Sequence, residues 1–479
     1  MRNLTMMTDL YQLTMMYGYY KHGMRDYKAG FDLFYRKNGE NTTYAVAAGL
    51  EQAIEYITNL SFETDDIDYL RSLNLFDEEF LSYLGELKFT GDIDAVPEGT
   101  LVFPMEPILK VYAPIMEAQL VETALLNIIN HQTLIATKAS RVRQAAVNDS
   151  VLEFGLRRAQ GPDAGIYGAR AAMIGGCDAT SNVMTGEMFG TPIKGTHAHS
   201  WVMSFDTELE AFQTYADTFP DNCLLLVDTY DTLKSGVPNA IKVFENLKAQ
   251  GHTATGIRLD SGDLAYLSKK ARKMLDEAGF ENALIFASGD LDEEVIWDLK
   301  AQGARIDVWG VGTRLITSLD NPALGGVYKL CAEERNGVVT PRLKVSDNPA
   351  KVTLPGLKSL YRVYDNDTGK AFADLIALAD EKYDSKEPIT LFDPVETWKS
   401  TTLTDYTIKS LHTPIYRNGE LVYQSPTLNE IKVFAKAELD TFWDEYKRLR
   451  RPHRYKVDLS QKLYDLRHEL LTAAQRKSN

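Results

Sequence analysis

The 479-residue sequence contains little cysteine: only Cys177, Cys223 and Cys331, with no CxxC pair among them. This excludes a disulfide scaffold and is typical of a reducing compartment. Long hydrophobic runs are also lacking, since LLLV at 224–227 falls far short of the roughly 20 residues that span a membrane. Asp9 and polar residues interrupt the N-terminal stretch, so no signal peptide is expected. We therefore expect a cytoplasmic protein with no membrane association.

An excess of positive charge is absent as well. The chain carries 52 basic and 67 acidic residues, a formal net charge of −15. This balance argues against bulk binding to nucleic acid or anionic membrane, but it leaves room for local basic pockets that bind small phosphates. The basic run at 447–456 is accordingly interpreted as a solvated surface or a subunit contact. No internal repeat is visible, so solenoids and propellers are not expected.

The middle of the chain does contain a strand–helix rhythm. Short apolar runs, each ending in a polar cluster and followed by a helical stretch, cover residues 150–158, 223–232, 254–263, 283–290 and 307–315. Continuous apolar strands that alternate with helices predict a parallel sheet covered on both faces. Polar residues at strand C-termini suit the active-site face of a β/α barrel and also that of a doubly wound open sheet. We favour the barrel, because at least five such units follow one another without an obvious crossover break.

This rhythm also divides the chain. Residues 1–135 are predicted to form the N-terminal part of an α/β domain, and residues 136–335 the barrel. Residues 336–428 return to the first domain, and residues 429–479 form a C-terminal helical segment. Within the first part, the pattern predicts a helix over 44–60, Pro-punctuated strands over 91–112 and an apolar helix over 116–133.

Carboxylates gather at the predicted strand ends, namely Asp228, Asp231, Asp260, Asp263 and Asp290. Converging carboxylates can bind a metal, hold ribose hydroxyls or stabilise a developing cation. Asp in the first turn of a helix is also a common N-cap. For Asp231 and Asp263, capping explains the position at least as well as chemistry does. Asp260 and Asp290 lie in tight glycine-containing turns, where we favour a function.

Glycine turns and arginines adjoin the same strand ends. ASGD at 287–290 and WGVGT at 309–313 place glycine after a strand, where backbone N–H groups can form an anion nest; ordinary tight turns explain the spacing equally well. The arginines at predicted strand ends are Arg157, Arg158, Arg258 and Arg314. Guanidinium groups bind phosphates and carboxylates, so the set favours a site for a phosphorylated sugar and an acidic co-substrate, although single Arg–Asp pairs can be structural.

Two histidines, His197 and His199, lie in KGTHAHSWVMSF at 194–205. If this segment is a strand, both side chains share a face, and the pair is compatible with zinc in a metal-dependent barrel hydrolase. Such a hydrolase needs further histidines at later strand ends, and only His252 lies among the barrel units, before its strand. A general base, a phosphoryl acceptor and a packed histidine are the other interpretations.

Several longer motifs together resemble the nicotinate phosphoribosyltransferase family. They are TDLYQLTM at 8–15, FGLRRAQGPD at 154–163, GTHAHSWVMSF at 195–205, RLDSGDL at 258–264, and GVGTRL with NPALGGVYKL at 310–330, with RYKVDLSQKLYDLRHELL at 454–471 as a weaker trace. The resemblance implies an α/β fold: an irregular β/α barrel of the type II phosphoribosyltransferase kind plus an open-faced α/β sandwich built from N- and C-terminal segments.

The resemblance also implies an activity. Members transfer a phosphoribosyl group from 5-phosphoribosyl-1-pyrophosphate (PRPP) to nicotinate, forming nicotinate mononucleotide and pyrophosphate in NAD salvage. ATP is hydrolysed through a phosphohistidine, which places the enzymes in the ligase class, and Mg²⁺ is required. A homodimer with shared active sites is implied. The alternatives are a nicotinamide-using enzyme of the same fold, the metal-dependent hydrolase, and a non-catalytic binding protein, which sits poorly with the intact set of Asp, Arg and His.

Residue roles follow from the motifs. His199 matches the phosphorylated histidine, and Asp260 is the second catalytic position. The nicotinate-binding positions are Tyr11, Phe154, Arg157, Thr196 and Arg258. The PRPP- and phosphate-binding positions are Ser288, Gly289, Asp290, Gly310, Gly312 and Thr313. Asp260 and Asp290 match ribose- or metal-side carboxylates, and no residue is singled out as a metal ligand. His197, Lys138 and Arg141 receive no role.

Overall fold

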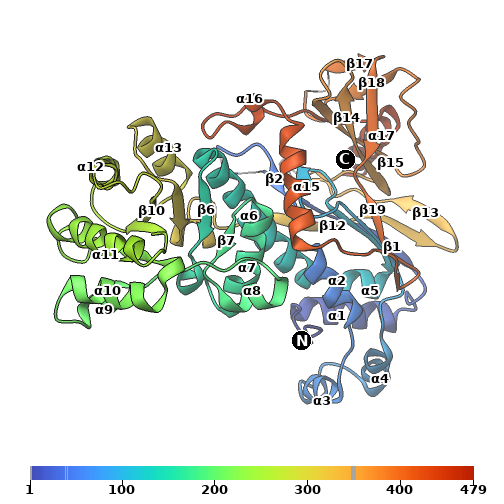
Figure 1. The fold of residues 1–479 in the computed structure, drawn as a ribbon. Helices are drawn as coiled ribbons and strands as arrows, with labels where there is room; N and C mark the ends of the chain where they lie inside the picture. The colour runs from blue at the N-terminus through green and yellow to red at the C-terminus, as the bar shows by residue number, and fades with distance from the viewer. Residues whose placement is uncertain (1–2, 38, 40, 347–351, 397, 479) are drawn as a thin grey trace. The chain divides into compact units, whose positions relative to one another are not determined.

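The computed structural model describes residues 3–37, 39, 41–346, 352–396 and 398–478. The chain divides into two compact units (Figure 1). One, the discontinuous unit, consists of Met1–Leu134 and Ala323–Asn479; the other, the barrel unit, consists of Ile135–Pro322. Within the described residues, no helix combines the length and apolar character that a membrane crossing requires.

The discontinuous unit contains two large sheets and a small one. The first sheet has the order β13 (Val338–Pro341), β12 (Gly326–Arg335), β1 (Lys28–Tyr35), β5 (Leu109–Pro114), β3 (Asp92–Ala95), β19 (Thr413–Arg417), β20 (Glu420–Leu421). The second has the order β17 (Ser400–Leu403), β16 (Ile389–Phe392), β21 (Val457–Leu459), β15 (Ala371–Leu378), β14 (Lys358–Asp365), β18 (Tyr406–Ser410). β2 (Ala45–Val46) pairs with β4 (Leu101–Val102). Segments from both ends of the sequence therefore share the first sheet, whereas the second is built from C-terminal strands.

Helices accompany these sheets, namely α1 (Leu10–Lys21), α2 (Leu50–Thr58), α3 (Thr64–Ser72), α4 (Glu78–Glu86), α5 (Ile115–Leu120), α15 (Leu428–Asp440), α16 (Asp444–Lys447) and α17 (Gln461–Ser478). The helix α6 (Glu122–Ala146) continues from this unit into the barrel unit. The predicted helix over 44–60 is wrong in its first turn. Ala45 and Val46 pair with β4 instead, and Gly49, at φ 102°, turns the chain into α2.

The barrel unit contains a parallel six-stranded sheet. Its order is β7 (Ala179–Thr180), β6 (Ser150–Glu153), β11 (Val308–Val311), β10 (Leu284–Ser288), β9 (Gly256–Leu259), β8 (Leu224–Leu226). Each neighbouring pair is parallel. Because β6 pairs with β11, the first strand of the barrel unit lies beside its last strand. The strands thus follow the cyclic order of a barrel whose only interruption, among the described residues, falls between β7 and β8, and the predicted irregular β/α barrel is confirmed.

Helices follow the strands as the sequence rhythm predicts. They are α7 (Pro162–Ile174), α8 (Val183–Phe189), α9 (His199–Met203), α10 (Glu208–Thr218), α11 (Val237–Ala249), α12 (Leu264–Glu277), α13 (Glu293–Ala301) and α14 (Thr313–Ile316). In Figure 1, α11, α12 and α13 lie on the outer side of the strands. The carboxyl ends of the parallel strands consequently meet at one rim, which carries the polar clusters.

Candidate active site

The interruption between β7 and β8 is occupied by residues 192–199. On the β7 side, Thr180 N donates to Pro192 O at 3.1 Å and Lys194 N donates to Thr180 O at 2.9 Å. On the β8 side, side chains replace the backbone ladder. Thr196 Oγ1 donates to Leu224 O at 2.8 Å, and Leu226 N donates to His197 Nε2 at 3.2 Å. We call this stretch the seam of the barrel.

The seam corrects one expectation. Residues 194–205 do not form a strand, because the chain turns into α9 at His199. His197 and His199 therefore have different surroundings. The His197 ring is buried against Phe212 and Tyr215 and accepts a backbone hydrogen bond, whereas the His199 side chain is 40% exposed at the rim. His197 is a packed histidine with a structural bond.

Burial lowers the pKa of His197 to about 4, and the positive charges of Arg258 and protonated His199 act in the same direction. The imidazole is thus neutral at physiological pH. A neutral ring with Nε2 as acceptor carries its proton on Nδ1, which lies 3.4 Å from Ala198 O.

We predict that His197→Phe, which keeps an aromatic ring but removes the acceptor, lowers the free energy of unfolding at pH 7 by about 1–3 kcal/mol, because Leu226 N loses its partner. A depressed folded-state pKa stabilises the fold above the unfolded value near 6.5, and this contribution is lost as pH falls towards 4. The full shift is worth roughly 3 kcal/mol. Urea unfolding at pH 7 and pH 5 should therefore show a smaller loss of stability on acidification in the variant than in the parent.

The control is His252→Gln, which removes a partly exposed histidine paired with Asp221 on the same unit. Its expected effect is below about 1 kcal/mol. A His197→Phe protein that loses stability between pH 7 and 5 as steeply as the parent contradicts the prediction.

The catalytic candidates meet at the rim through Asp228, the residue that follows β8 by two positions. His199 Nε2 lies 3.2 Å from Asp228 Oδ1. Asp228 Oδ2 accepts from Asp260 N at 2.8 Å and from Ser261 Oγ at 2.7 Å. The Asp228 side chain is only 2% exposed. One buried carboxylate therefore fixes the His199 ring relative to the Asp260 turn.

Asp260 belongs to a second cluster at the ends of β9 and β10. Ser288 Oγ donates to Asp260 Oδ1, and Arg258 Nη2 donates to the same oxygen at 2.7 Å. Arg258 Nε also donates to Ser288 Oγ at 2.8 Å. Burial alone would raise the pKa of Asp260, but the Ser288 hydrogen bond and the Arg258 charge outweigh it and hold the pKa below its usual value. The site thus keeps an ionised carboxylate at neutral pH.

Phe154, after β6, completes the group, because the Arg258 guanidinium carbon lies 5.7 Å from its ring centroid. A Cβ on Gly310 would lie 2.7 Å from that ring, so glycine is required there for the phenylalanine to occupy its position. Gly289 is needed for two reasons. Its φ is +98°, and a Cβ would lie 2.3 Å from the carbonyl oxygen of Asp260. Two of the sequence-predicted glycines therefore shape the site by allowing close approach.

The remaining predicted residues lie as follows. Gly312 follows β11, Thr313 is the first residue of α14, and Asp290 follows Gly289 with φ 46°, so all three lie at the rim. Arg157 is exposed in the 3₁₀ turn Leu156–Arg158. Tyr11 lies on α1 of the discontinuous unit, 47% exposed, and is not among the residues that the barrel unit brings together.

Capping accounts for two of the strand-end carboxylates. Asp231 accepts from Leu233 N and Lys234 N, and Asp263 accepts from Tyr266 N at 3.0 Å. Nowhere in the described part of the chain do three or more His, Cys, Asp or Glu side chains gather closely enough to hold a metal ion.

Sequence reasoning included Asp228 without singling it out, and it missed Glu153. Asp228 was one of five similar carboxylates, and only its burial and contacts separate it from the others. Glu153, at the end of β6, is buried and accepts from Gly155 N and from Thr180 Oγ1, the latter at 2.6 Å. Burial raises the pKa of Glu153. An acidic residue inside an apolar strand was the available signal.

Comparison with known proteins assigns the chain to a class. Models of the nicotinate phosphoribosyltransferase N-terminal domain, family and C-terminal domain match residues 6–130, 150–374 and 357–467. The chain is 51% identical to a nicotinate phosphoribosyltransferase of Bacillus subtilis (strain 168) over 459 residues, which cover 96% of this chain and 93% of that protein. A Caenorhabditis elegans nicotinate phosphoribosyltransferase is 38% identical over 526 residues, covering 97% and 93%.

The fold agrees with these matches. The crystal structure of human nicotinic acid phosphoribosyltransferase superimposes with a TM-score of 0.86 at 32% identity, covering 97% of this chain and 99% of that one. A barrel with an acid–histidine rim, in a chain that also contains an α/β unit, thus places the protein among phosphoribosyl-handling enzymes. The chain belongs to the nicotinate phosphoribosyltransferase family, which confirms the resemblance drawn from its motifs.

Proposed function

We propose that the protein transfers the phosphoribosyl group of PRPP to nicotinate, forming nicotinate mononucleotide and pyrophosphate for NAD salvage, with ATP hydrolysis coupled through His199. The observation that carries this proposal is the Asp228–His199–Asp260 arrangement, in which one buried carboxylate joins a histidine at the seam to an ionised carboxylate at the rim. Family membership supplies the substrate class.

Nicotinate recognition falls to Phe154 and Arg258. A flat pyridine ring stacks on an aromatic face, and a guanidinium pairs with a carboxylate. Arg258 is 15% exposed and already held by Ser288 and Asp260, so its remaining N–H groups are pre-oriented. Arg157 adds a cation from the turn after β6, and Thr196 belongs to the seam, where its hydroxyl donates to Leu224 O. This donor set favours nicotinate over neutral nicotinamide, because nicotinamide offers no charge to the arginine.

Transfer of the ribosyl group develops positive charge on the sugar, as in glycoside hydrolysis. The ionised Asp260 carboxylate stabilises that charge, since the site fixes it in place before reaction. Ser288, Gly289 and Asp290 at the end of β10, and Gly310, Gly312 and Thr313 between the end of β11 and the start of α14, offer hydroxyl and backbone N–H groups to the phosphates.

Mg²⁺ fits this donor set. It is usually held by one or two carboxylates together with substrate phosphates rather than by a cage of protein ligands. Asp260, whose Oδ1 takes the hydrogen bonds from Arg258 and Ser288, can offer Oδ2, and the exposed Asp290 lies on the adjacent loop. When bound, the ion neutralises charge on the departing pyrophosphate.

ATP coupling falls to His199. Asp228 holds Nε2, which leaves the Nδ1 lone pair as nucleophile. Attack of Nδ1 on the γ-phosphorus forms a P–N bond while the bond to the β,γ-bridging oxygen breaks, and ADP leaves with the electron pair. Water later cleaves the P–N bond and releases phosphate. The added charge at the seam orders the neighbouring loops for PRPP.

The protein is further proposed to act in the cytoplasm as a homodimer with shared active sites. The three cysteines are free and buried, which suits a reducing compartment. Leu10 and Tyr11 leave 52% and 47% of their surface exposed on α1 and are available to a second copy. Light scattering at micromolar concentration should give the mass of a dimer, and a monomer mass excludes shared sites.

The decisive experiment is product analysis with PRPP, Mg²⁺ and ATP, with nicotinate and nicotinamide offered separately. Nicotinate mononucleotide together with ADP is the expected result. Product from nicotinamide alone would assign the protein to the nicotinamide-using alternative. Absence of nucleotide from both bases would overturn the function while the fold remained.

A further inference from the structure

Two loops of the barrel unit leave neighbouring strands at the same level. β10 and β11 are parallel, and Ser288 lies opposite Gly310 in their register. Residues 289–291 follow the first strand, and Gly312 and Thr313, the latter being the first residue of α14, follow the second. Both stretches carry positions assigned to PRPP phosphates in the proposed function, on which this inference rests.

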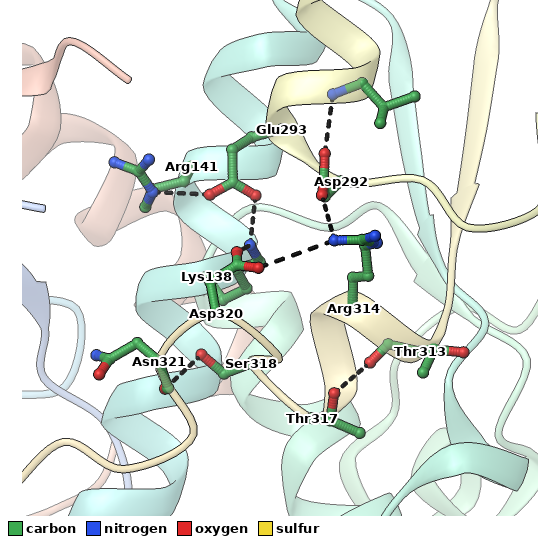
Figure 2. Close-up of polar contacts among 11 residues, drawn as sticks. Lys138, Arg141, Asp292, Glu293, Thr313, Arg314, Thr317, Ser318, Asp320 and Asn321 are labelled. Carbon is green, nitrogen blue, oxygen red and sulfur yellow. Dashed lines mark hydrogen bonds and ion pairs between the residues drawn. The ribbon is translucent and has the colours of Figure 1, made fainter. Parts of the chain in front are cut away.

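An ion pair also joins the C-terminal ends of the two loops. Asp292 comes directly after the first loop, and Arg314 comes directly after the second. Arg314 Nη1 lies 3.1 Å from Asp292 Oδ2 (Figure 2). Asp292 is 8% exposed in its side chain, and its Oδ1 accepts from Val295 N at 2.8 Å as the N-cap of α13. One carboxylate therefore both starts a helix and ties it to the neighbouring loop.

A buried network supports this ion pair from behind. Glu293, next to Asp292, binds two cations of α6: Lys138 Nζ lies 2.6 Å from its Oε2, and Arg141 Nε lies 2.9 Å from its Oε1. Lys138 also pairs with Asp320 in the turn after α14, and Arg314 lies 3.9 Å from the same carboxylate (Figure 2). Lys138 and Arg141 are 5% and 8% exposed, so both are committed to the network rather than to a ligand.

The network is balanced in charge. Three cations, Lys138, Arg141 and Arg314, face three carboxylates, Asp292, Glu293 and Asp320. The loops are thus tied at one end by the strand register and at the other by the Arg314–Asp292 pair, and the pair is anchored to α6. A short loop fixed at both ends presents its N–H groups in one arrangement, which lowers the ordering cost of binding an anion.

We propose that Arg314 and Asp292 are positioning residues that hold the two phosphate loops in register and thereby set the affinity for PRPP. Neither residue needs to touch the substrate. The pair acts through the backbone of residues 289–291 and 312–313.

The test is a double-mutant cycle with Arg314→Met and Asp292→Asn. Asparagine keeps the cap on Val295 N while removing the charge, and methionine keeps the length of the arginine side chain. Each single variant should raise the KM for PRPP and its calorimetric Kd about tenfold, while kcat changes less than about twofold. The double variant should raise the KM and Kd for PRPP by no more than about tenfold, because both changes remove the same interaction. Arg314→Lys should recover part of the affinity.

The control is Lys300→Met. Lys300, on the last turn of α13, pairs with Asp149 and donates to Ala146 O at 3.0 Å, so it anchors the other end of the same helix. Lys300→Met should lower the melting temperature about as much as the Arg314 and Asp292 variants do, and it should leave the KM for PRPP unchanged. Hydrogen exchange in the ligand-free protein should rise at 289–291 and 312–313 in the Arg314 and Asp292 variants only.

The outcomes separate the inference from the function beneath it. A parent protein that neither binds PRPP nor makes nicotinate mononucleotide overturns the proposed function. A parent that does both, with single variants of unchanged KM or with fully additive losses, overturns the positioning role. An equal rise in KM for Lys300→Met assigns the effect to general stability and overturns it as well.

Discussion

Replacing Asp260 with asparagine should lower kcat/KM for nicotinate mononucleotide formation by roughly 10²–10³, the range found when one preorganised electrostatic group is removed from an active site. Asparagine has the same shape, and its amide oxygen can still accept from Arg258 and Ser288. The change therefore removes the negative charge and little else. Steady-state rates at saturating ATP measure it directly.

The charge matters because the surroundings keep it ionised. The Ser288 hydrogen bond and the Arg258 charge hold the pKa of Asp260 low in spite of its burial. A carboxylate that needs no proton release or reorganisation is in place when positive charge develops on the ribose. Calorimetry of PRPP binding separates this contribution from ground-state affinity, since loss of transition-state stabilisation lowers kcat more than it weakens binding.

Asp263→Asn provides a matched control in the same RLDSGD turn. Asp263 caps α12 through Tyr266 N, and asparagine caps equally well. Its rate should stay within about twofold of the parent. An Asp260→Asn enzyme within threefold of the parent would sink the assignment of Asp260 to catalysis.

Replacing His199 with alanine should abolish ADP formation and ATP stimulation together, while a slow ATP-independent transfer remains. The expected reason is the loss of the phosphoryl acceptor, since alanine has no nucleophilic nitrogen. The Asp228 carboxylate is buried and already accepts hydrogen bonds from Asp260 N and Ser261 Oγ. Radiolabelled γ-phosphate should label the parent in an acid-labile, alkali-stable form and should leave the variant unlabelled. These are the properties of a phosphorylated nitrogen.

A second variant keeps this prediction independent of folding. Asp228→Asn removes the charge that faces His199 Nε2 but keeps an oxygen for Asp260 N and Ser261 Oγ. It should slow phosphorylation about tenfold to a hundredfold without abolishing it. His199→Ala protein that still hydrolyses ATP and is still stimulated by it would falsify the phosphohistidine assignment.

Much of the barrel unit follows from local sequence. Apolar strands that end in polar clusters predict the parallel sheet, and the glycine-containing turn alone favours a function for Asp260. N-capping likewise follows from local rules, as Asp231 and Asp263 show. Such features depend on neighbours within a few residues, so a sequence pattern contains them.

Local sequence patterns did not predict the seam or the ion-pair network. Thr196 and His197 are paired to β8 by side chains rather than by a backbone ladder, so this stretch shows no strand periodicity. Lys138 and Arg141 meet Glu293 more than a hundred residues later in the chain, and nothing near either cation indicates that partner. The short β21 was hidden in a stretch predicted as helical, because its pairing with β15 supplies most of its definition.

The seam also bears on motion. A strand held by a full backbone ladder leaves a sheet only at the cost of many hydrogen bonds, whereas residues 196–199 are joined to β8 through one hydroxyl, one imidazole and the His199–Asp228 contact. Local opening is cheapest where the fewest bonds must break. The histidine that we propose to be phosphorylated during turnover thus lies on a segment joined to β8 by side-chain contacts, and movement of that segment need not break any of the five strand pairings of the parallel sheet.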